Sequence, residues 1–156
     1  MAVNKNKKIL QWVCFLAYLL FVGYLLFFAS YFGRTEAGEG YRYNLVLFRE
    51  IERYYSLGMR RNTWMPFVLN VFGNIAVFVP LGVYLPSLFK QCKNFFFTGL
   101  LCFIASLMAE IIQLITRVGS FDVDDLLLNT VGGLLGYILY MIGCFYHMKK
   151  NAKNRK

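Results

Sequence analysis

Residues 95–146 read FFFTGLLCFIASLMAEIIQLITRVGSFDVDDLLLNTVGGLLGYILYMIGCFY, two apolar runs joined by a short acidic turn. The first run, 95–116, contains one charged residue, Glu110, and the second, 126–146, contains none. A helix needs about 20 mostly apolar residues to cross a bilayer. Both runs reach that length, so this stretch predicts two membrane-spanning helices with a charged turn between them.

Two further apolar runs, 9–32 and 66–89, contain no charged residue. Hydrophobic residues make up 58% of the 156-residue chain and charged residues 16%, against about 45–50% and about 25% in soluble domains. So little polar sequence could not cover a soluble core. The sequence therefore predicts an all-α integral membrane protein, a four-transmembrane-helix bundle that forms one domain over residues 1–156. The run 9–32 exceeds the roughly 7–15 apolar residues of a cleaved signal and is expected to be retained.

Basic residues indicate the topology. Ten of the 17 lie in 1–8, 90–93 and 147–156, where there is no Asp or Glu. The other seven are all arginines and share the opposite side with every acidic residue. The positive-inside rule places both termini in the cytoplasm, with an outer loop at 33–65 and a basic cytoplasmic tail at 147–156. The net charge of +9 is interpreted as a topology signal beside anionic lipid, with no nucleic-acid partner.

Within the outer loop, residues 44–58, NLVLFREIERYYSLG, show apolar side chains at helical spacing and Arg or Glu on the opposite face. Asn44 is a predicted N-cap and Gly58 a predicted stop. The pattern is typical of a short amphipathic helix on the outer leaflet. Such a helix either acts as a lid or ligand platform or simply seals the bundle.

One face of the third span is polar. Polar residues at offsets of 0, 4, 7 and 11 fall in one stripe of a helix, and here they are Ser106, Glu110, Gln113 and Arg117. Asn129 is the first polar residue of the fourth span, and Asn74 lies at similar depth in the second. We therefore expect Asn74, Glu110 and Asn129 to meet across three helices, with Gln113 close by.

Small residues and a proline shape the neighbouring helices. Small residues let two backbones approach closely, and positions +3, +4 and +7 from Asn129 hold Gly132, Gly133 and Gly136. We expect this face to turn Asn129 toward the third span. Pro80, two residues before Gly82, cannot donate a backbone hydrogen bond and should kink the second span. The kink either widens a pocket in the outer half or fits the helix to its neighbours.

Four of the chain's eight acidic residues fall between Glu110 and Asp125. Asp122 is a predicted cap of the fourth span, and Asp125 can bond back in a capping-box arrangement that also complements the helix dipole. Capping does not explain Glu110, since a charge inside a span costs roughly 2.5–3.5 kcal/mol on insertion scales and marks a functional hypothesis. Glu110 is either a functional carboxylate or part of a structural polar lock between helices.

Two stretches, NIAVFVPLGVYLP at 74–86 and ASLMAEIIQLITRVGSFDVDDLLLNTVGGLLGY at 105–137, resemble the VanZ-like family. The residues that carry the resemblance are Asn74, Phe78, Pro80, Gly82, Glu110, Gln113, Asp122, Asp125, Asn129, Thr130, Gly132, Gly133 and Gly136. NLVLF resembles the family's NLxPF with Leu47 in place of the proline, and Arg117 lies outside the pattern. The resemblance implies a multi-pass protein of the bacterial plasma membrane and cell envelope that lowers susceptibility to the glycopeptide teicoplanin.

The sequence supports three functional hypotheses. The first is an envelope protein that reduces glycopeptide susceptibility through an outward-facing polar site. Its partners would be the bilayer and a lipid-linked cell-wall precursor or a lipoglycopeptide at the outer leaflet, and a homo-oligomer is compatible with it. The predicted site consists of Asn74, Glu110, Gln113, Asp122, Asp125 and Asn129, with Ser106, Arg117 and Asp124 as secondary candidates and Pro80, Gly82, Gly132, Gly133 and Gly136 as structural residues.

The second hypothesis is a membrane enzyme that acts on a lipid-linked or isoprenoid-phosphate headgroup, with carboxylates around a divalent cation. The predicted outer side has no histidine and the chain has no CxxC motif, so common hydrolase constellations cannot be assembled. The third is a small proton-coupled transporter with Glu110 as the proton carrier, which the lack of repeated halves weakens. The sequence favours a non-enzymatic protein without metal or cofactor.

Overall fold

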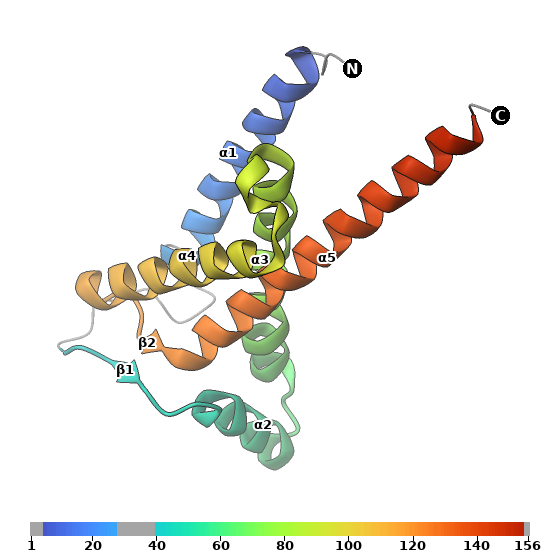
Figure 1. Cartoon of the computed structure of the whole chain (residues 1–156). Coiled ribbons are helices and arrows are strands. Elements are labelled where there is room, and N and C mark those ends of the chain that lie inside the picture. Colours follow the sequence, from blue (N-terminus) through green and yellow to red (C-terminus); the bar gives the residue numbers. More distant parts are fainter. Residues whose placement is uncertain (1–4, 28–39, 155–156) are drawn as a thin grey trace.

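The computed structural model describes residues 5–27 and 40–154. Four long helices, α1 (Lys5–Phe27), α3 (Met65–Leu88), α4 (Phe95–Thr116) and α5 (Val123–Lys153), make up most of the chain (Figure 1). The shorter elements are β1 (Tyr43–Asn44), α2 (Arg49–Arg61), the 3₁₀ turn η2 (Lys90–Lys93) and β2 (Phe121–Asp122). The two strands pair in parallel, with Asn44 opposite Asp122.

Among the described residues, α1, α3, α4 and α5 are each long and apolar enough to cross a membrane, which confirms the four predicted spans. The part of the first predicted span beyond Phe27 lies outside the described residues. α4 has the predicted bounds, whereas α5 continues to Lys153, so most of the predicted tail is helical. Its 31 residues extend for about 46 Å at about 1.5 Å per residue, well beyond the roughly 30 Å of bilayer hydrocarbon.

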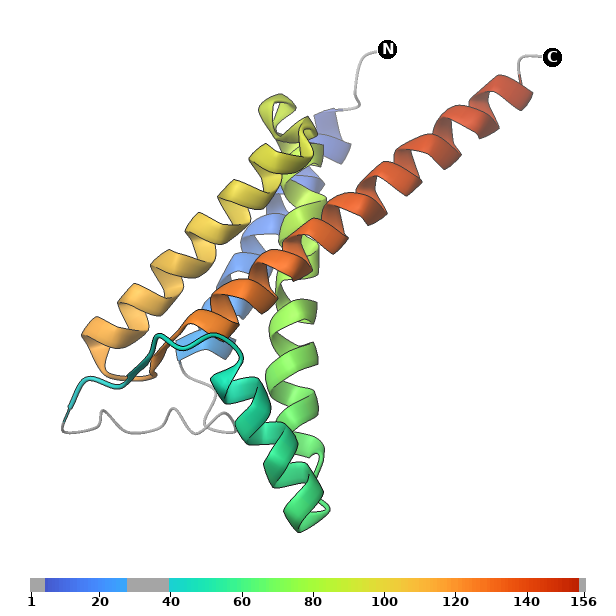
Figure 2. The ribbon, with the colours of Figure 1, turned by 60° about the horizontal axis from the view of Figure 1, so that its bottom comes forward.

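The first half of α5 crosses α3 and packs along α4 (Figure 2). Glycines make this crossing close: a Cβ added at Gly132 would lie 2.2 Å from Ile75 O, and one at Gly136 would lie 2.0 Å from Val79 O. We expected the glycine face to turn toward the third span, but Gly132 and Gly136 face α3, the second. The two backbones touch there because neither glycine carries a side chain.

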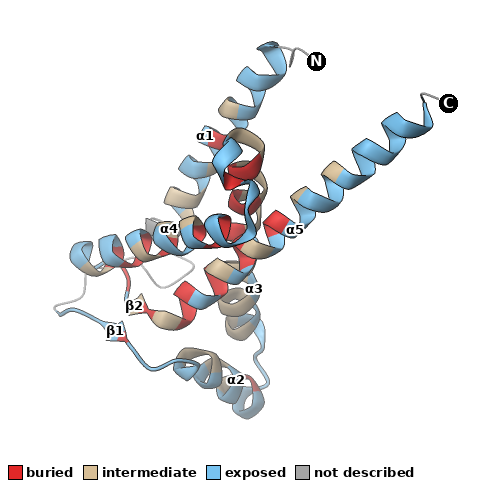
Figure 3. Cartoon of the chain, in the orientation of Figure 1, coloured by how far each residue is buried: buried red, intermediate tan, exposed pale blue. Residues whose placement is uncertain are grey.

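Gly133 and Gly82 complete the crossing. A Cβ at Gly82 would lie 1.8 Å from Gly133 O, and a Cβ at Gly133 would lie 2.3 Å from the sulfur of Cys102 on α4. Gly133 therefore sits between α3 and α4. Buried residues cluster at this crossing and at the α4–α5 turn, while the second half of α5 is exposed (Figure 3).

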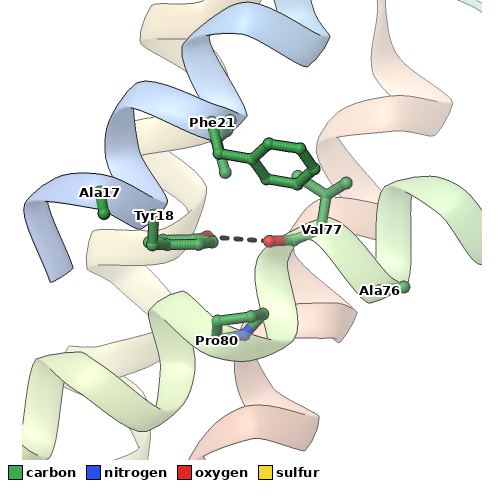
Figure 4. Close-up of a pocket in the computed structure, with 7 residues that line it drawn as sticks. Ala17, Tyr18, Phe21, Ala76, Val77 and Pro80 are labelled. Atoms are coloured by element: carbon green, nitrogen blue, oxygen red, sulfur yellow. Dashed lines mark hydrogen bonds between the residues drawn. The ribbon is translucent and has the colours of Figure 1, made fainter. Parts of the chain in front are cut away.

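α1 packs on α3 beside the proline. Pro80 has no N–H to donate to Ala76 O, and the Tyr18 hydroxyl of α1 donates to the next carbonyl, Val77 O, at 2.8 Å (Figure 4). α3 continues through the proline. An apolar groove of about 530 Å³ opens here between α1 and α3. The contact with α1 and the groove both lie beside Pro80, so each of its two predicted roles stays a prediction.

The segment predicted to form the outer loop contains a helix whose bounds differ from the prediction. α2 begins at Arg49 and runs past Gly58 to Arg61. Asn44 does not cap it, because β1 pairs with β2 and holds Asn44 opposite Asp122. Gly58 does not end the helix; it packs against Trp64, whose ring would lie 2.8 Å from an added Cβ. The position of α2 on the outer leaflet stays a prediction.

Candidate functional site

Buried polar side chains gather where the α4–α5 turn meets β1 and α2. They are Asn44, Ser106, Glu110, Gln113, Asp122, Asp124, Asp125 and Asn129, joined by the half-buried Asn74 of α3. We call this set the acidic node, and all six primary residues of the predicted site belong to it. A buried carboxylate is costly unless hydrogen bonds satisfy it, so the partners of each acid indicate what the node does.

Asp122 joins β2 to the start of α5. Its Oδ1 accepts hydrogen bonds from the Asp124 N–H at 2.8 Å and from Asn44 Nδ2 at 3.1 Å. The first bond is the predicted N-cap of α5, which the structure confirms. Burial raises the pKa of the Asp122 carboxyl above its ordinary value, although the two hydrogen bonds act in the opposite direction.

Glu110 takes the position in the capping box that we predicted for Asp125. The Asp122 N–H donates to Glu110 Oε2 at 3.0 Å, across the turn from α4 to α5. Asp125 instead accepts a hydrogen bond from Asn74 Nδ2 of α3. Asp is one methylene shorter than the Glu of a usual capping box, and Asn74 offers Asp125 a donor on the neighbouring helix. Glu110 of α4 therefore has a structural partner on another element, the Asp122 N–H at the start of α5.

Asp124 caps a different helix. Its side chain has no exposed surface, and its oxygens accept hydrogen bonds from the Phe48, Glu50 and Ile51 amides at the start of α2. The first amides of a helix have no partner within the helix, and α2 has no side-chain cap of its own. The negative charge also complements the positive end of the α2 dipole. The secondary candidate Asp124 thus fixes α2 to α5.

Asn44 is a member of the node that sequence reasoning missed. Its Oδ1 accepts from the Val46 N–H and its Nδ2 donates to Val46 O, both at 3.1 Å, which forms a tight turn before α2. The same Nδ2 donates to Asp122. Asn residues favour such local turns, and the absence of a capping residue in LVLF, residues 45–48, was the available signal that α2 is capped from elsewhere.

A hydrogen bond joins two of the other predicted residues, Asn129 and Ser106. Asn129 Nδ2 of α5 donates to Ser106 Oγ of α4 at 2.8 Å, which places Asn129 toward the third span as predicted. Gln113 is buried and packs against the backbone at Gly119. Among the described residues, two buried amide oxygens, Asn129 Oδ1 and Asn70 Oδ1, have no hydrogen-bond partner.

Arg117 departs from the predicted polar stripe. α4 ends at Thr116, and Arg117 has a left-handed backbone with φ of 59° at its C-cap. The exposed guanidinium lies 4.9 Å from the centre of the Tyr41 ring, a cation–π contact. The helix ends before the fourth member of the stripe, so Arg117 lies outside the node.

The node connects elements by hydrogen bonds to amides. Asp122 and Asp124 accept from backbone and Asn amides of β1, α2 and α5. Within the described part of the chain, no group of three or more His, Cys, Asp and Glu side chains is placed to hold a metal ion. His147 lies on the exposed far end of α5, beside Asn151. What the arrangement can do is hold the loop, α2 and three long helices in one fixed relation.

Four apolar helices of spanning length, three of which meet at a buried polar node, define a multi-pass helical membrane protein. The chain belongs to the VanZ/LLP1 family, whose sequence model matches residues 15–145. It is similar to Protein VanZ of Enterococcus faecium, with 40% identity over 67 residues that cover 43% of this chain and 41% of that protein. The match thus spans less than half of the relative. No solved structure matches the chain.

Proposed function

We propose that this chain is a bacterial plasma-membrane protein that lowers susceptibility to glycopeptide antibiotics such as teicoplanin. Membership in the VanZ/LLP1 family supports this role. In the proposed topology both termini are cytoplasmic and the acidic node faces outward. The arrangement of the chain supports a shared side for the two termini, because the start of α1 and the end of α5 lie at one end of the molecule and the β1–β2 pair lies at the other (Figures 1 and 2).

The observation that carries the proposal is the burial of four acids, Glu110, Asp122, Asp124 and Asp125, at the end of the molecule that lacks lysine. The node links α2 and β1 to α3, α4 and α5. We propose that the surface so organised engages a lipid-linked cell-wall precursor or a lipoglycopeptide at the outer leaflet. Asn129 Oδ1, a buried acceptor without a partner among the described residues, would take a donor from such a ligand.

The resistance role is tested by expressing the full chain in a glycopeptide-susceptible bacterium and measuring the inhibitory concentration of teicoplanin. The wild-type chain should raise that concentration relative to an empty vector. An antibiotic of another class with an intracellular target serves as the control and should act equally on both strains. Unchanged teicoplanin susceptibility, with the protein present in the membrane fraction, would refute the proposed function.

The topology has its own test. Ser120, in the α4–α5 turn, and Asn151, near the end of α5, are both exposed. In a chain whose Cys14 and Cys144 are replaced by serine, a membrane-impermeant maleimide added to intact cells should label Ser120→Cys and leave Asn151→Cys unlabelled. The native Cys92 and Cys102 are buried and give little background. The opposite labelling pattern would invert the proposed orientation.

A further inference from the structure

Four consecutive apolar side chains outside the long helices are exposed. Leu45, Val46, Leu47 and Phe48 are 64%, 57%, 49% and 48% exposed, and we call them the apolar tip. The tip lies directly between the buried Asn44 and the start of α2. A contiguous exposed apolar patch on a folded surface marks a contact with a membrane or another molecule.

The backbone of the tip is held by the acidic node. Val46 bonds Asn44 through both its N–H and its carbonyl, and the Phe48 N–H donates to Asp124. Phe48 also has a left-handed backbone, with φ of 66°. Since these backbone groups bond inward, the apolar side chains are held outward. Asp124 thus holds the end of the tip directly, and Asp122 holds its start through Asn44.

The surface of α2 divides into three sectors. Ile51, Tyr54 and Leu57 are half-buried, and Gly58 is buried, so this sector packs on the bundle. Tyr55 and Met59, one turn apart, form an exposed apolar sector. An exposed arginine sector runs along the remaining face and consists of Arg49, Arg53 and Arg60. A helix with one packed sector, one apolar sector and one cationic sector fits a boundary between lipid and water.

The exposed charge of the described residues at this end of the molecule is positive. The sequence nearly balances arginines and acids here, but the node buries four of the carboxylates. Among the described residues outside the node at this end, six arginines remain against two glutamates, an excess of four positive charges; they are Arg42, Arg49, Arg53, Arg60, Arg61 and Arg117, with Glu50 and Glu52. Guanidinium groups bind phosphate through paired hydrogen bonds.

α2 is also continuous with the surface of a spanning helix. The Tyr55 ring contacts the rings of Trp64 and Phe67 at centroid distances of 5.6 and 5.9 Å. Beyond them, α3 exposes Val68 and Phe72 along its apolar length. Tyr and Trp concentrate where helices pass from hydrocarbon to headgroups. The aromatic contact therefore places α2 beside the point where α3 enters the bilayer.

We propose that the apolar tip and the Tyr55–Met59 sector insert into the headgroup–acyl boundary of the bilayer that α3 crosses, while the arginine sector of α2 contacts lipid phosphates. The occupant of this surface is lipid, and the acidic node acts as the clamp that holds the tip in the lipid. This inference needs α3 to enter the bilayer at Met65 but does not depend on the resistance role.

The test uses spin labels on the full chain, reconstituted into vesicles of phosphatidylcholine and phosphatidylglycerol. Leu47→Cys and Met59→Cys are labelled in the chain with serine at Cys14 and Cys144, and Ser120→Cys is the matched control in an exposed turn at the same end. Labels at 47 and 59 should collide mainly with oxygen, which concentrates in lipid, and the label at 120 mainly with a water-soluble nickel chelate. Equal nickel accessibility at 47 and 120 would overturn the proposal. Spin–spin broadening at position 47 that disappears on dilution with unlabelled protein would also overturn it, because a second copy of the chain would then cover the tip.

The arginine contact is tested separately. Raising the fraction of phosphatidylglycerol should increase the oxygen preference at position 47, and Arg49→Gln with Arg60→Gln should remove that dependence. Lys149→Gln with Lys150→Gln removes the same amount of charge at the other end of the molecule and should preserve the dependence on phosphatidylglycerol. Equal loss in both double variants would show a net-charge effect and overturn the arginine contact. Abolition by inorganic phosphate would assign the site to free anion instead of lipid.

Discussion

The glycine crossing and the acidic node hold the first half of α5 by opposite means. At the crossing, Gly132 and Gly136 bring α5 against the backbone of α3 because they lack side-chain atoms. At the node, Asp122, Asp124 and Asp125 hold the start of the same helix through particular oxygen atoms. The crossing should therefore respond to the volume of a substituted side chain and the node to its hydrogen-bonding atoms.

The second half of α5 makes the contrast clearer. After Tyr137 no residue of this helix is buried in the structure. Gly143 lies there with open space where a Cβ would be. Packing thus requires a glycine at position 136 of this helix but not at position 143. The two positions allow matched substitutions within one helix.

The largest expected effect on stability is at the crossing. Gly136→Ala would place a Cβ 2.0 Å from Val79 O, a backbone atom that can yield only if the helices separate. Overpacking typically costs about 1–3 kcal/mol and sometimes more, and a backbone clash lies at the upper end. Denaturant unfolding in detergent should show this loss in the free energy of unfolding. Gly143→Ala is the control and should be neutral or stabilising by about 0.5–1 kcal/mol, so equal destabilisation by both would contradict the crossing.

The fold could be predicted as far as local properties determine it. Apolar length located the four spans, because each span must satisfy its own backbone within lipid. The bounds of α2 could not be predicted, because the amides at its start bond to a distant residue, Asp124. Asp124 lies 74 residues after Glu50 and 76 residues after Phe48. A local search for a cap at Asn44 therefore could not find the start of the helix.

The second expected effect is at Asp124, and it is local to α2. In the wild-type chain both oxygens of Asp124 accept hydrogen bonds from backbone N–H groups. Asp124→Asn retains one oxygen but replaces the other by an NH₂ group, which cannot accept from those donors. Leaving a buried donor unpaired costs about 1–3 kcal/mol, which corresponds to roughly fivefold to 150-fold in an opening equilibrium. Hydrogen exchange at the Phe48, Glu50 and Ile51 amides should accelerate by that factor. Glu52→Gln removes an exposed charge from the same helix and should leave exchange unchanged; protection that persists in Asp124→Asn would show that Asp124 is not the cap.

The sequence could predict which residues belong to the site but not which of them form hydrogen bonds with one another. Helical spacing placed Glu110 and Gln113 on one buried face, since the stripe is a property of one helix. The partners came from other elements: Asn74 bonds Asp125, and Glu110 bonds the Asp122 amide. Arg117 was assigned to the stripe wrongly because the helix ends one residue earlier.

A smaller effect on stability is expected at Glu110, where function and architecture separate. Glu110→Gln retains an oxygen for the Asp122 N–H and should lose about 1 kcal/mol, the difference between a charged and a neutral hydrogen bond. Under the proposed function, this variant and Asp125→Asn accumulate in the membrane near the wild-type level yet lose protection against teicoplanin. Growth assays at matched expression measure it. Full protection by both variants would leave the node as architecture alone.

The smallest expected effect is the pH dependence of Asp122. Because burial raises its pKa in the folded protein, the native state holds this proton at pH values where the unfolded chain, with an Asp pKa near 3.9, has released it. The free energy of unfolding therefore falls as pH rises through this window, by at most about 1.4 kcal/mol per pH unit, and is constant above the raised pKa. Asp122→Asn keeps an acceptor for Asn44 and the Asp124 amide but cannot titrate. The stability of the wild-type protein relative to Asp122→Asn, followed by denaturant unfolding from neutral pH downward, should thus increase on acidification. A decrease would mean that the two hydrogen bonds outweigh burial, and that the charged form of Asp122 is the one the fold favours.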